Sequence, residues 1–175
     1  MSTDVLVAYA SKHGATAEIA EHIAHVLRGG GLRVEVAPAG AVHDLGPYTA
    51  VVLGSAVYMG GWRREAARFL KRFEQELSER PVWLFSSGPT GLGDPVALVH
   101  GRRVPDGLKA LVAGIEPKDV TVFHGRLDPE TLGRIERWVV TRVAAPSGDF
   151  RDAAAIRDWA QGIASELTPA VLAPA

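Results

Sequence analysis

The sequence predicts a doubly wound α/β domain, with five parallel strands and helices on both faces of the sheet. Short β-branched, apolar runs alternate with longer segments of helical periodicity, which is typical of βαβ units. The first such run, residues 5–10, is apolar throughout, as expected for a strand that is covered on both faces. The chain has 175 residues, of which 47% are hydrophobic, and this suits one globular domain. We place the domain at residues 1–168 and expect residues 169–175 to form a flexible tail.

The strands of the predicted sheet are short and the helices between them are amphipathic. We expect strands at 5–10, 32–37, 49–54, 82–86 and 120–125. We expect helices after residue 16, over 66–77, and at 106–115, 129–144 and 152–167, with loops at 55–61 and 87–105.

The helix at 129–144 allows two interpretations. Four apolar residues recur at helical spacing, so we expect this helix to pack on the sheet: Leu132, Ile135, Val139 and Val143. The same segment also carries three arginines and Trp138, so contact with a membrane surface is the alternative.

Composition excludes several classes of protein. The chain has no cysteine, which excludes disulfides, thiolate zinc sites and a cysteine nucleophile. The formal net charge of −1 gives no electrostatic basis for binding nucleic acid. His22 and His25 lack a third ligand at motif spacing, so we predict no metal. No leader and no bilayer-length apolar run is recognised, so we expect a cytoplasmic protein, with peripheral membrane contact left open.

The loop after the first strand is a candidate phosphate site. In a doubly wound sheet, ligands bind outside the carboxyl ends of the strands, and a helix N-terminus there presents free N–H groups. The loop lacks the glycine spacing of nucleoside triphosphate and dinucleotide sites, which favours a single monophosphate. An ordinary helix cap is the alternative. The candidate ligand-binding residues are Ser11, Lys12, His13, Gly14, Ala15 and Thr16.

The loops after the third and fourth strands complete the predicted site. The first of them is rich in glycine and aromatic residues, so Tyr58 and Trp62 could flank a flat ring, although both could equally be packing residues. The second has small residues that permit close approach to the backbone. The candidates are Ser55, Ala56, Val57, Tyr58, Met59, Gly60 and Trp62 in one loop and Ser87, Gly88, Pro89 and Thr90 in the other.

These three loops resemble those of the flavodoxin family. The resemblance implies FMN as the cofactor and the strand order 2-1-3-4-5, which is the order of flavodoxin itself and comes from the resemblance alone. Within the family, the chain is most similar to the branch of the menaquinone-dependent protoporphyrinogen oxidases. The runs that carry this likeness are 10–16, 54–58, 123–127 and 148–152, with Ile156 and Trp159. Tyr58 and Met59 stand where that branch carries an arginine and a tyrosine.

The branch resemblance and the charge together favour an enzyme. Ordinary flavodoxins are strongly acidic, whereas this chain has 19 Lys and Arg against 20 Asp and Glu. We expect Arg63, Arg102 and Arg103 to form a cationic rim that receives a small anionic substrate. The alternative is that these arginines are solvated, or are paired with acids such as Glu65 and Asp94.

The predicted function is therefore an FMN-binding oxidoreductase. It would pass electrons between a small organic substrate, such as a porphyrinogen, and an acceptor such as a quinone. The alternatives are an electron-transfer flavodoxin that serves a redox protein, and a flavin-free binding module on the same fold.

Overall fold

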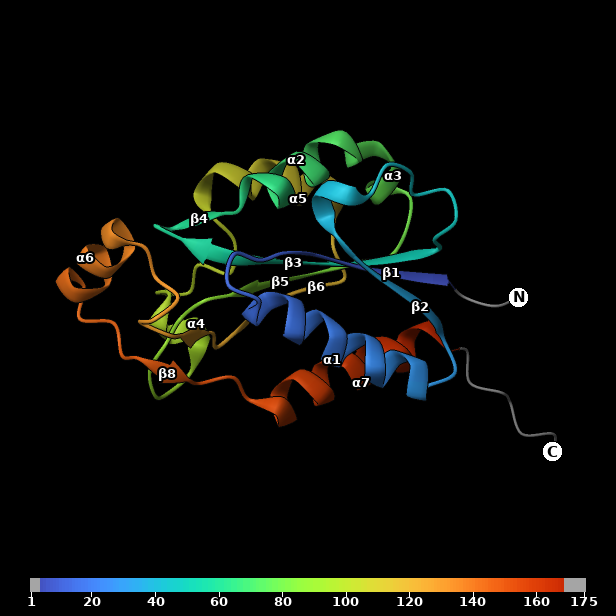
Figure 1. Ribbon diagram of the computed structural model, residues 1–175. Coiled ribbons are helices and arrows are strands. Elements are labelled where there is room, and N and C mark those ends of the chain that lie inside the picture. The colour runs from blue at the N-terminus through green and yellow to red at the C-terminus, as the bar shows by residue number, and fades with distance from the viewer. Residues whose placement is uncertain (1–3, 169–175) are drawn as a thin grey trace, which may run out of the picture.

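The computed structural model describes residues 4–168 and has the predicted three-layer α/β/α architecture (Figure 1). Five parallel strands follow the order β2-β1-β3-β5-β6, and a short strand, β4, pairs with β3. The strands of the sheet are β1 (Asp4–Ala10), β2 (Arg33–Pro38), β3 (Ala50–Tyr58), β4 (Gly61–Trp62), β5 (Val82–Ser87) and β6 (Asp119–Phe123). Since β4 belongs to a hairpin, the five parallel strands have the expected 2-1-3-4-5 order, and the fold prediction is confirmed.

Helices cover both faces of this sheet. One face carries α1 (Ala15–Gly29) and α7 (Ala153–Leu167), and the other carries α2 (Arg64–Arg72), α3 (Glu74–Ser78) and α5 (Lys109–Ile115). Successive side chains of a strand point to opposite faces, so each strand serves two cores. Leu6, Leu53 and Leu84 pack on the α2 side. Val5 and Phe85 pack on the α1 side.

The register brings the carboxyl ends of the central strands to one edge. Four residues form one row across the sheet, each opposite the next: Ala10 of β1, Ser55 of β3, Ser86 of β5 and Val122 of β6. The loops that leave β1, β3 and β5 therefore begin side by side, at the edge where doubly wound sheets bind ligands.

The segment 55–62 is a β-hairpin and not the predicted loop. β3 continues to Tyr58 and pairs antiparallel with β4, with Val57 opposite Trp62. The tip is formed by Met59 and Gly60, both of which have positive φ angles, 49° and 76°. Local pairing thus gives the predicted binding loop a rigid backbone.

The prediction that the helix at 129–144 packs on the sheet is wrong. The helix, α6 (Arg134–Arg142), has no buried residue, and Ile135 is 80% exposed. It lies beyond the carboxyl ends of the strands (Figure 1). Two short strands, β7 (Arg126–Leu127) and β8 (Gly148–Asp149), pair antiparallel at the two ends of the segment 128–147. We call this segment, which contains α6, the excursion. The face of the sheet is already covered by α1 and α7, so the apolar side of α6 has to find another partner.

Four remaining segments differ in detail from the prediction. The helix expected over 66–77 is divided into α2 and α3. The loop 87–105 contains the short helix α4 (Pro95–Leu98), which the carboxylate of Asp94 caps, and 3-10 turns occur at η1 (Ala39–Ala41) and η2 (Asp106–Leu108). The predicted tail at 169–175 lies outside the described residues.

The contact between Gly54 and the Phe85 ring yields a test of the core. A Cβ atom on Gly54 would lie 1.9 Å from the Cζ atom of Phe85, so Gly54→Ala requires this buried ring to shift. We expect the free energy of unfolding to fall by about 1–3 kcal/mol in urea titrations. The matched control is Gly162→Ala in α7, where an added Cβ meets nothing within 4 Å. Better helix propensity should make that variant up to about 1 kcal/mol more stable. Equal effects in the two variants would contradict this account of the packing.

Candidate cofactor site

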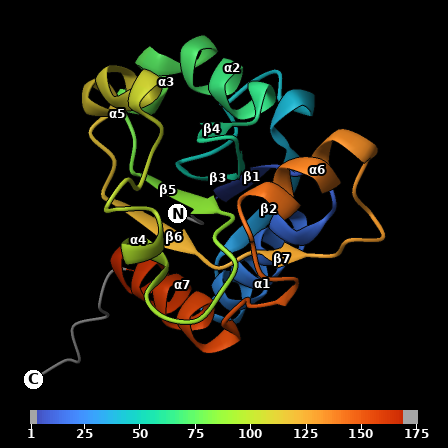
Figure 2. The same cartoon turned by 90° about the vertical axis from the view of Figure 1, so that its left-hand side faces the viewer.

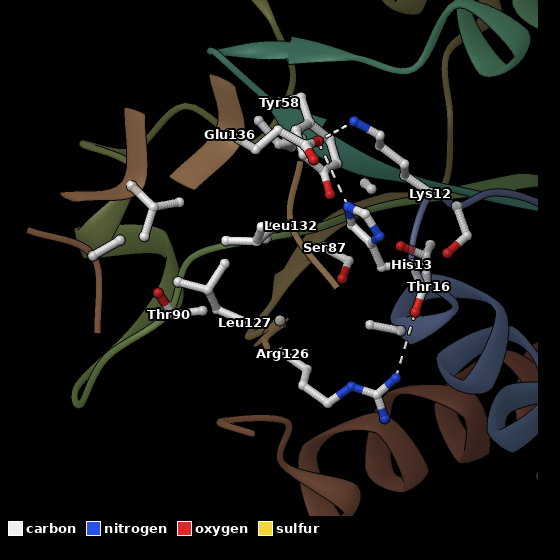
Figure 3. Close-up of a pocket in the computed structure, with 18 of the residues that line it drawn as sticks. Lys12, His13, Thr16, Tyr58, Ser87, Thr90, Arg126, Leu127, Leu132 and Glu136 are labelled. Carbon is white, nitrogen blue, oxygen red and sulfur yellow. Dashed lines mark hydrogen bonds and ion pairs between the residues drawn. The ribbon is translucent and has the colours of Figure 1, made fainter. Parts of the chain in front are cut away.

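A cavity of about 450 Å³ lies at the carboxyl ends of the strands (Figure 3). All three predicted loops contribute to its wall, and so do the segment 125–127 and α6. The predicted residues that line it are Ser11, Lys12, His13, Ala15, Thr16, Ala56, Val57, Tyr58, Met59, Arg63, Ser87, Gly88 and Thr90. Residues up to 79 positions apart in the sequence are thus brought together around one space.

Several predicted residues support this wall from behind or lie elsewhere. Gly14 precedes α1 as its N-cap. Ser55 is fully buried, and its hydroxyl accepts a hydrogen bond from the Arg63 N–H at 3.0 Å, which fixes the hairpin. Gly60 and Pro89 line a neighbouring cavity instead.

Trp62 does not face the cofactor cavity. Only 8% of its surface is exposed, and its indole N–H donates to the Ser86 hydroxyl at 2.8 Å. The Ser86 hydroxyl in turn donates to the Arg103 carbonyl at 2.7 Å. Because β4 folds back along β3, the indole is directed into the core under α2, where it packs as an ordinary aromatic residue.

The N-terminus of α1 forms the end of the cavity whose geometry suits an anion. Gly14 adopts a φ of 86° and supplies no side-chain cap, while the Ser11 hydroxyl accepts the Gly14 N–H at 3.0 Å. The first hydrogen bond of the helix joins the Glu18 N–H to the Gly14 carbonyl. The preceding N–H groups of the first turn therefore have no partner within the helix. Together with the Thr16 hydroxyl on the cavity wall, they fit a phosphate.

Tyr58 provides the aromatic wall of the cavity. The Lys12 ammonium lies 5.4 Å from the centre of its ring, and the His13 ring is tilted against it at 6.2 Å between centroids. Burial raises the pKa of the Tyr58 phenol, Glu136 raises it further, and Arg63 opposes them. Tyr58 is therefore a neutral phenol at physiological pH, suited to contact with a flat ring.

Helix α6 closes the cavity from the side opposite the sheet (Figures 1 and 3). Its inner face contributes Val139 and Val140, and Leu132 precedes it. Glu136 pairs with the Lys12 ammonium, and its carboxylate lies 3.6 Å from the His13 Nε2 atom. The Lys12 ammonium, followed by the Gly133 N–H, lowers the pKa of Glu136 to about 2.

Sequence reasoning missed α6 as part of the site. The apolar periodicity of the helix was a usable signal, but periodicity does not say which surface it faces. Arg126 was also missed, although the sequence run 123–127 contributes to the family resemblance.

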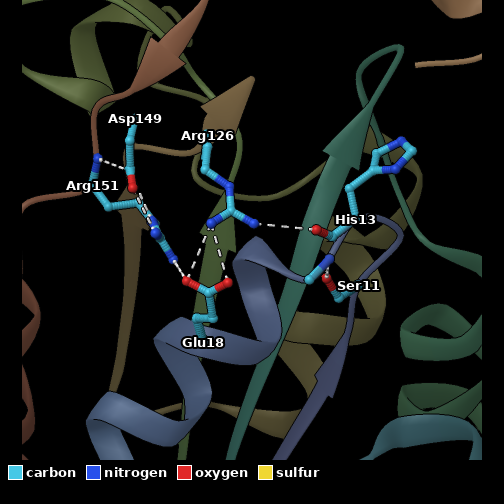
Figure 4. A network of polar contacts seen from close by, with 7 residues as sticks. Ser11, His13, Glu18, Arg126, Asp149 and Arg151 are labelled. Atoms are coloured by element: carbon cyan, nitrogen blue, oxygen red, sulfur yellow. Dashed lines mark hydrogen bonds and ion pairs between the residues drawn. The ribbon is translucent and has the colours of Figure 1, made fainter. Parts of the chain in front are cut away.

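A network of ion pairs holds the phosphate loop against the β7–β8 pair (Figure 4). The Arg126 guanidinium donates to the His13 carbonyl at 3.4 Å and lies 3.1 Å from the Glu18 carboxylate. Arg151 joins Glu18 to Asp149, whose carboxylate lies 2.6 Å away. Arg151 lowers the pKa of Asp149 to about 2 and also lowers that of Glu18. The excursion that carries α6 is thus anchored to the start of α1.

The three arginines that were predicted to form one rim are directed to different places. Arg63 lines the cofactor cavity and pairs with Glu65 at 3.1 Å. Arg102 lines a second cavity, of about 460 Å³. Arg103 is turned away: its guanidinium donates to the Val120 carbonyl at 2.8 Å and lies 4.0 Å from Asp119. The prediction that Arg103 belongs to the rim is therefore wrong, because its side chain is held along β6.

The second cavity adjoins the first. The two share Val57, Met59 and Gly88, which form the wall between them. The second cavity is otherwise formed by the segment after β5 and by Val143, just after α6.

The Arg151 network yields a prediction about pH. In wild type, the pKa of Asp149 lies below its ordinary value of 3.8, so the ion pair stabilises the fold fully above that pH. This contribution is lost as the pH falls to about 2. In Arg151→Gln, we expect the pKa of Asp149 to return toward 3.8, as measured by NMR titration. The difference in unfolding free energy between wild type and variant should shrink over the same interval. An unchanged pKa of Asp149 in the variant would contradict the assignment.

Comparison with known proteins identifies the family. The family model described as flavodoxin domain matches residues 6–153. Among curated proteins, no sequence matches the chain. Within residues 4–168, no helix is both long and apolar enough to cross a membrane.

Solved structures resemble the chain over nearly its whole length. A short-chain flavodoxin associated with a non-canonical PDU bacterial microcompartment has a TM-score of 0.61 at 12% identity, covering 95% of this chain and 99% of that one. The flavodoxin of Streptococcus pneumoniae TIGR4 has a TM-score of 0.60 at 16% identity, covering 94% and 100%. Oxidised flavodoxin 1 from Bacillus cereus has a TM-score of 0.57 at 14% identity, covering 95% and 100%. These likenesses establish the shared fold, and the chain belongs to the flavodoxin domain family, whose cofactor is FMN.

Proposed function

We propose that this protein is an FMN-dependent oxidoreductase that acts on a small organic substrate. The observation that carries the proposal is the second cavity, which shares the wall of Val57, Met59 and Gly88 with the cofactor cavity. At about 460 Å³, this cavity has room for a small molecule beside the cofactor.

The cofactor cavity offers the groups that FMN requires. Ser11, Thr16 and the N–H groups of the first turn of α1 would hold the phosphate, and Tyr58 and the apolar face of α6 would contact the ring. Bound FMN supplies the electron transfer. The protein positions the ring, keeps water away from it through α6, and holds cations near it through Lys12 and Arg63.

The second cavity suits an apolar molecule that carries an anionic group. Leu98, Val99 and Val104 line it, together with His100 and Arg102. Of the described residues that line it, Asp106 is the one acid, and it is paired with Lys109 at 2.6 Å. Within this proposal, a carboxylate-bearing porphyrinogen is the substrate and a quinone the acceptor, as the likeness to the protoporphyrinogen oxidase branch suggests. We propose a cytoplasmic location for this activity.

An electron-transfer flavodoxin that serves a redox protein is the second candidate. It is favoured by the position of Tyr58 and Met59, where the oxidase branch carries other residues. A flavin-free module is a third candidate, and it would purify without colour.

The absorbance spectrum separates these candidates. We expect the purified protein, after FMN is added and excess removed, to retain bands near ~375 and ~450 nm. Turnover of protoporphyrinogen with a quinone would support the enzyme. A stable one-electron reduced form without turnover would support the shuttle, and absence of retained flavin would overturn both.

Adjacent arginines provide a matched test of the substrate cavity. Arg102→Ala removes a cation from the second cavity, whereas Arg103→Ala removes one that is held along β6. Loss of one charged contact should raise KM about tenfold for Arg102→Ala, with FMN binding unchanged. Arg103→Ala should retain the wild-type KM, and equal effects would exclude Arg102 from substrate binding.

Glu136 provides a test of the phosphate end. Its carboxylate pairs with Lys12 of the loop 11–16. The negative charge of this carboxylate would repel the FMN phosphate bound at the same loop. We expect Glu136→Gln to bind FMN about fivefold more tightly, the equivalent of about 1 kcal/mol, by flavin fluorescence quenching. Binding of riboflavin, which lacks the phosphate, should not change. Glu130→Gln, an exposed residue that precedes α6, is the control, and a similar gain there or with riboflavin would contradict the assignment.

A further inference from the structure

The large apolar side chains that are exposed on the described residues gather at one end of the molecule. They come from the β3–β4 tip, the segment after β5 and α6, which lie at the carboxyl ends of the strands (Figure 1). This end of the molecule faces the viewer in Figure 2. These side chains and their exposed fractions are Met59 91%, Leu92 89%, Leu98 41%, Ile135 80%, Trp138 63% and Val143 65%. The opposite end and the helical faces of residues 4–168 carry no comparable side chain.

The outer face of α6 combines these apolar groups with positive charge. Trp138 and Arg142 lie four residues apart on this face, and the Arg142 guanidinium lies 5.5 Å from the centre of the Trp138 ring. Ile135 lies at the border of the face, because it is 80% exposed and also lines the cofactor cavity. Arg134 and Arg137 are also exposed. The single acid of the helix, Glu136, is turned inward to Lys12. The outward face therefore carries arginines, Trp138 and the neutral Thr141, and no acid of α6.

We propose that this end of the molecule docks on the surface of an anionic phospholipid bilayer, with α6 lying among the headgroups. A helix that combines arginines with tryptophan on one exposed face is suited to the interface of a membrane. The arginines would meet the lipid phosphates, and the apolar side chains would enter the boundary of the acyl chains. The acids Asp94, Asp128 and Glu130 are exposed near this end, and the first two accept hydrogen bonds from backbone N–H groups of their own turns.

The shape of the surface favours lipid over a protein partner. Met59 and Leu92 project almost fully from two different loops, and Ile135 projects from a helix. Separate projecting side chains can each enter a fluid boundary, whereas a protein interface needs a matching rigid surface. A second copy of this chain would bring the arginines of two α6 helices together.

Docking has a consequence for the site, and this consequence rests on the proposed function. Because α6 forms part of the wall of the cofactor cavity and Val143 part of the wall of the second cavity, docking would bring both cavities to the lipid surface. A substrate or acceptor dissolved in the membrane could then reach them directly. The docking itself does not depend on which reaction the protein performs.

Vesicle sedimentation tests the proposal with the full chain loaded with FMN. We expect binding to phosphatidylcholine vesicles that contain phosphatidylglycerol, and little binding to phosphatidylcholine alone. Arg134→Gln with Arg142→Gln should weaken binding about fivefold for each arginine removed. Leu92→Ser with Trp138→Ser should weaken it at least as much, and neither of these residues lines the two cavities. Trp138 fluorescence should shift to shorter wavelength with vesicles, because this indole is 63% exposed.

A matched control separates local docking from net charge. Arg157→Gln with Lys118→Gln removes the same charge from exposed positions on α7 and before β6. This variant should bind like wild type. Equal loss in both charge variants, binding that is insensitive to phosphatidylglycerol, or a dimer that buries Trp138 would overturn the proposal. If the protein retains the flavin bands but does not bind vesicles, the docking proposal is wrong and the proposed function is unaffected.

Discussion

The aligned carboxyl ends of parallel strands are the constraint on which the rest of this structure depends. Parallel pairing of β1, β3 and β5 sets Ala10, Ser55 and Ser86 in one row, so the chain leaves the sheet three times at one edge. Every other feature of the site follows from that edge. The free N–H groups of α1, the hairpin tip and the turn after β5 face a common space because no alternative register is compatible with the buried faces.

The segment between β6 and α7 completes the wall of the cofactor cavity. Paired strands β7 and β8 carry α6 away from the sheet and over the cavity. Its inner face contributes apolar side chains and Glu136, and its outer face leaves Trp138 exposed. One short helix thereby controls both what the cavity contains and what the end of the molecule contacts. The ion pairs of Arg126 and Arg151 hold its base against α1.

Most of the fold was predictable because it depends on local patterns. The apolar runs that became β1 and β5 are buried on both faces, and the amphipathic runs that became α1 and α7 bury one stripe each. The hairpin at 55–62 and the location of α6 were not predictable. A two-residue strand has no periodicity of its own, and the apolar stripe of α6 looks the same whether it faces a sheet or a cavity.

The sequence by itself determined the sheet, the order of the helices and the loop that suits a phosphate. These depend on hydrophobic periodicity and on glycine at a helix start, and neighbouring residues carry both signals. Tertiary structure alone decided that Trp62 packs in the core, that Arg102 and Arg103 separate, and that Glu136 meets Lys12. Each of these depends on the direction in which a side chain leaves the backbone and on partners up to 124 residues away. Residue type and spacing contain no record of such contacts.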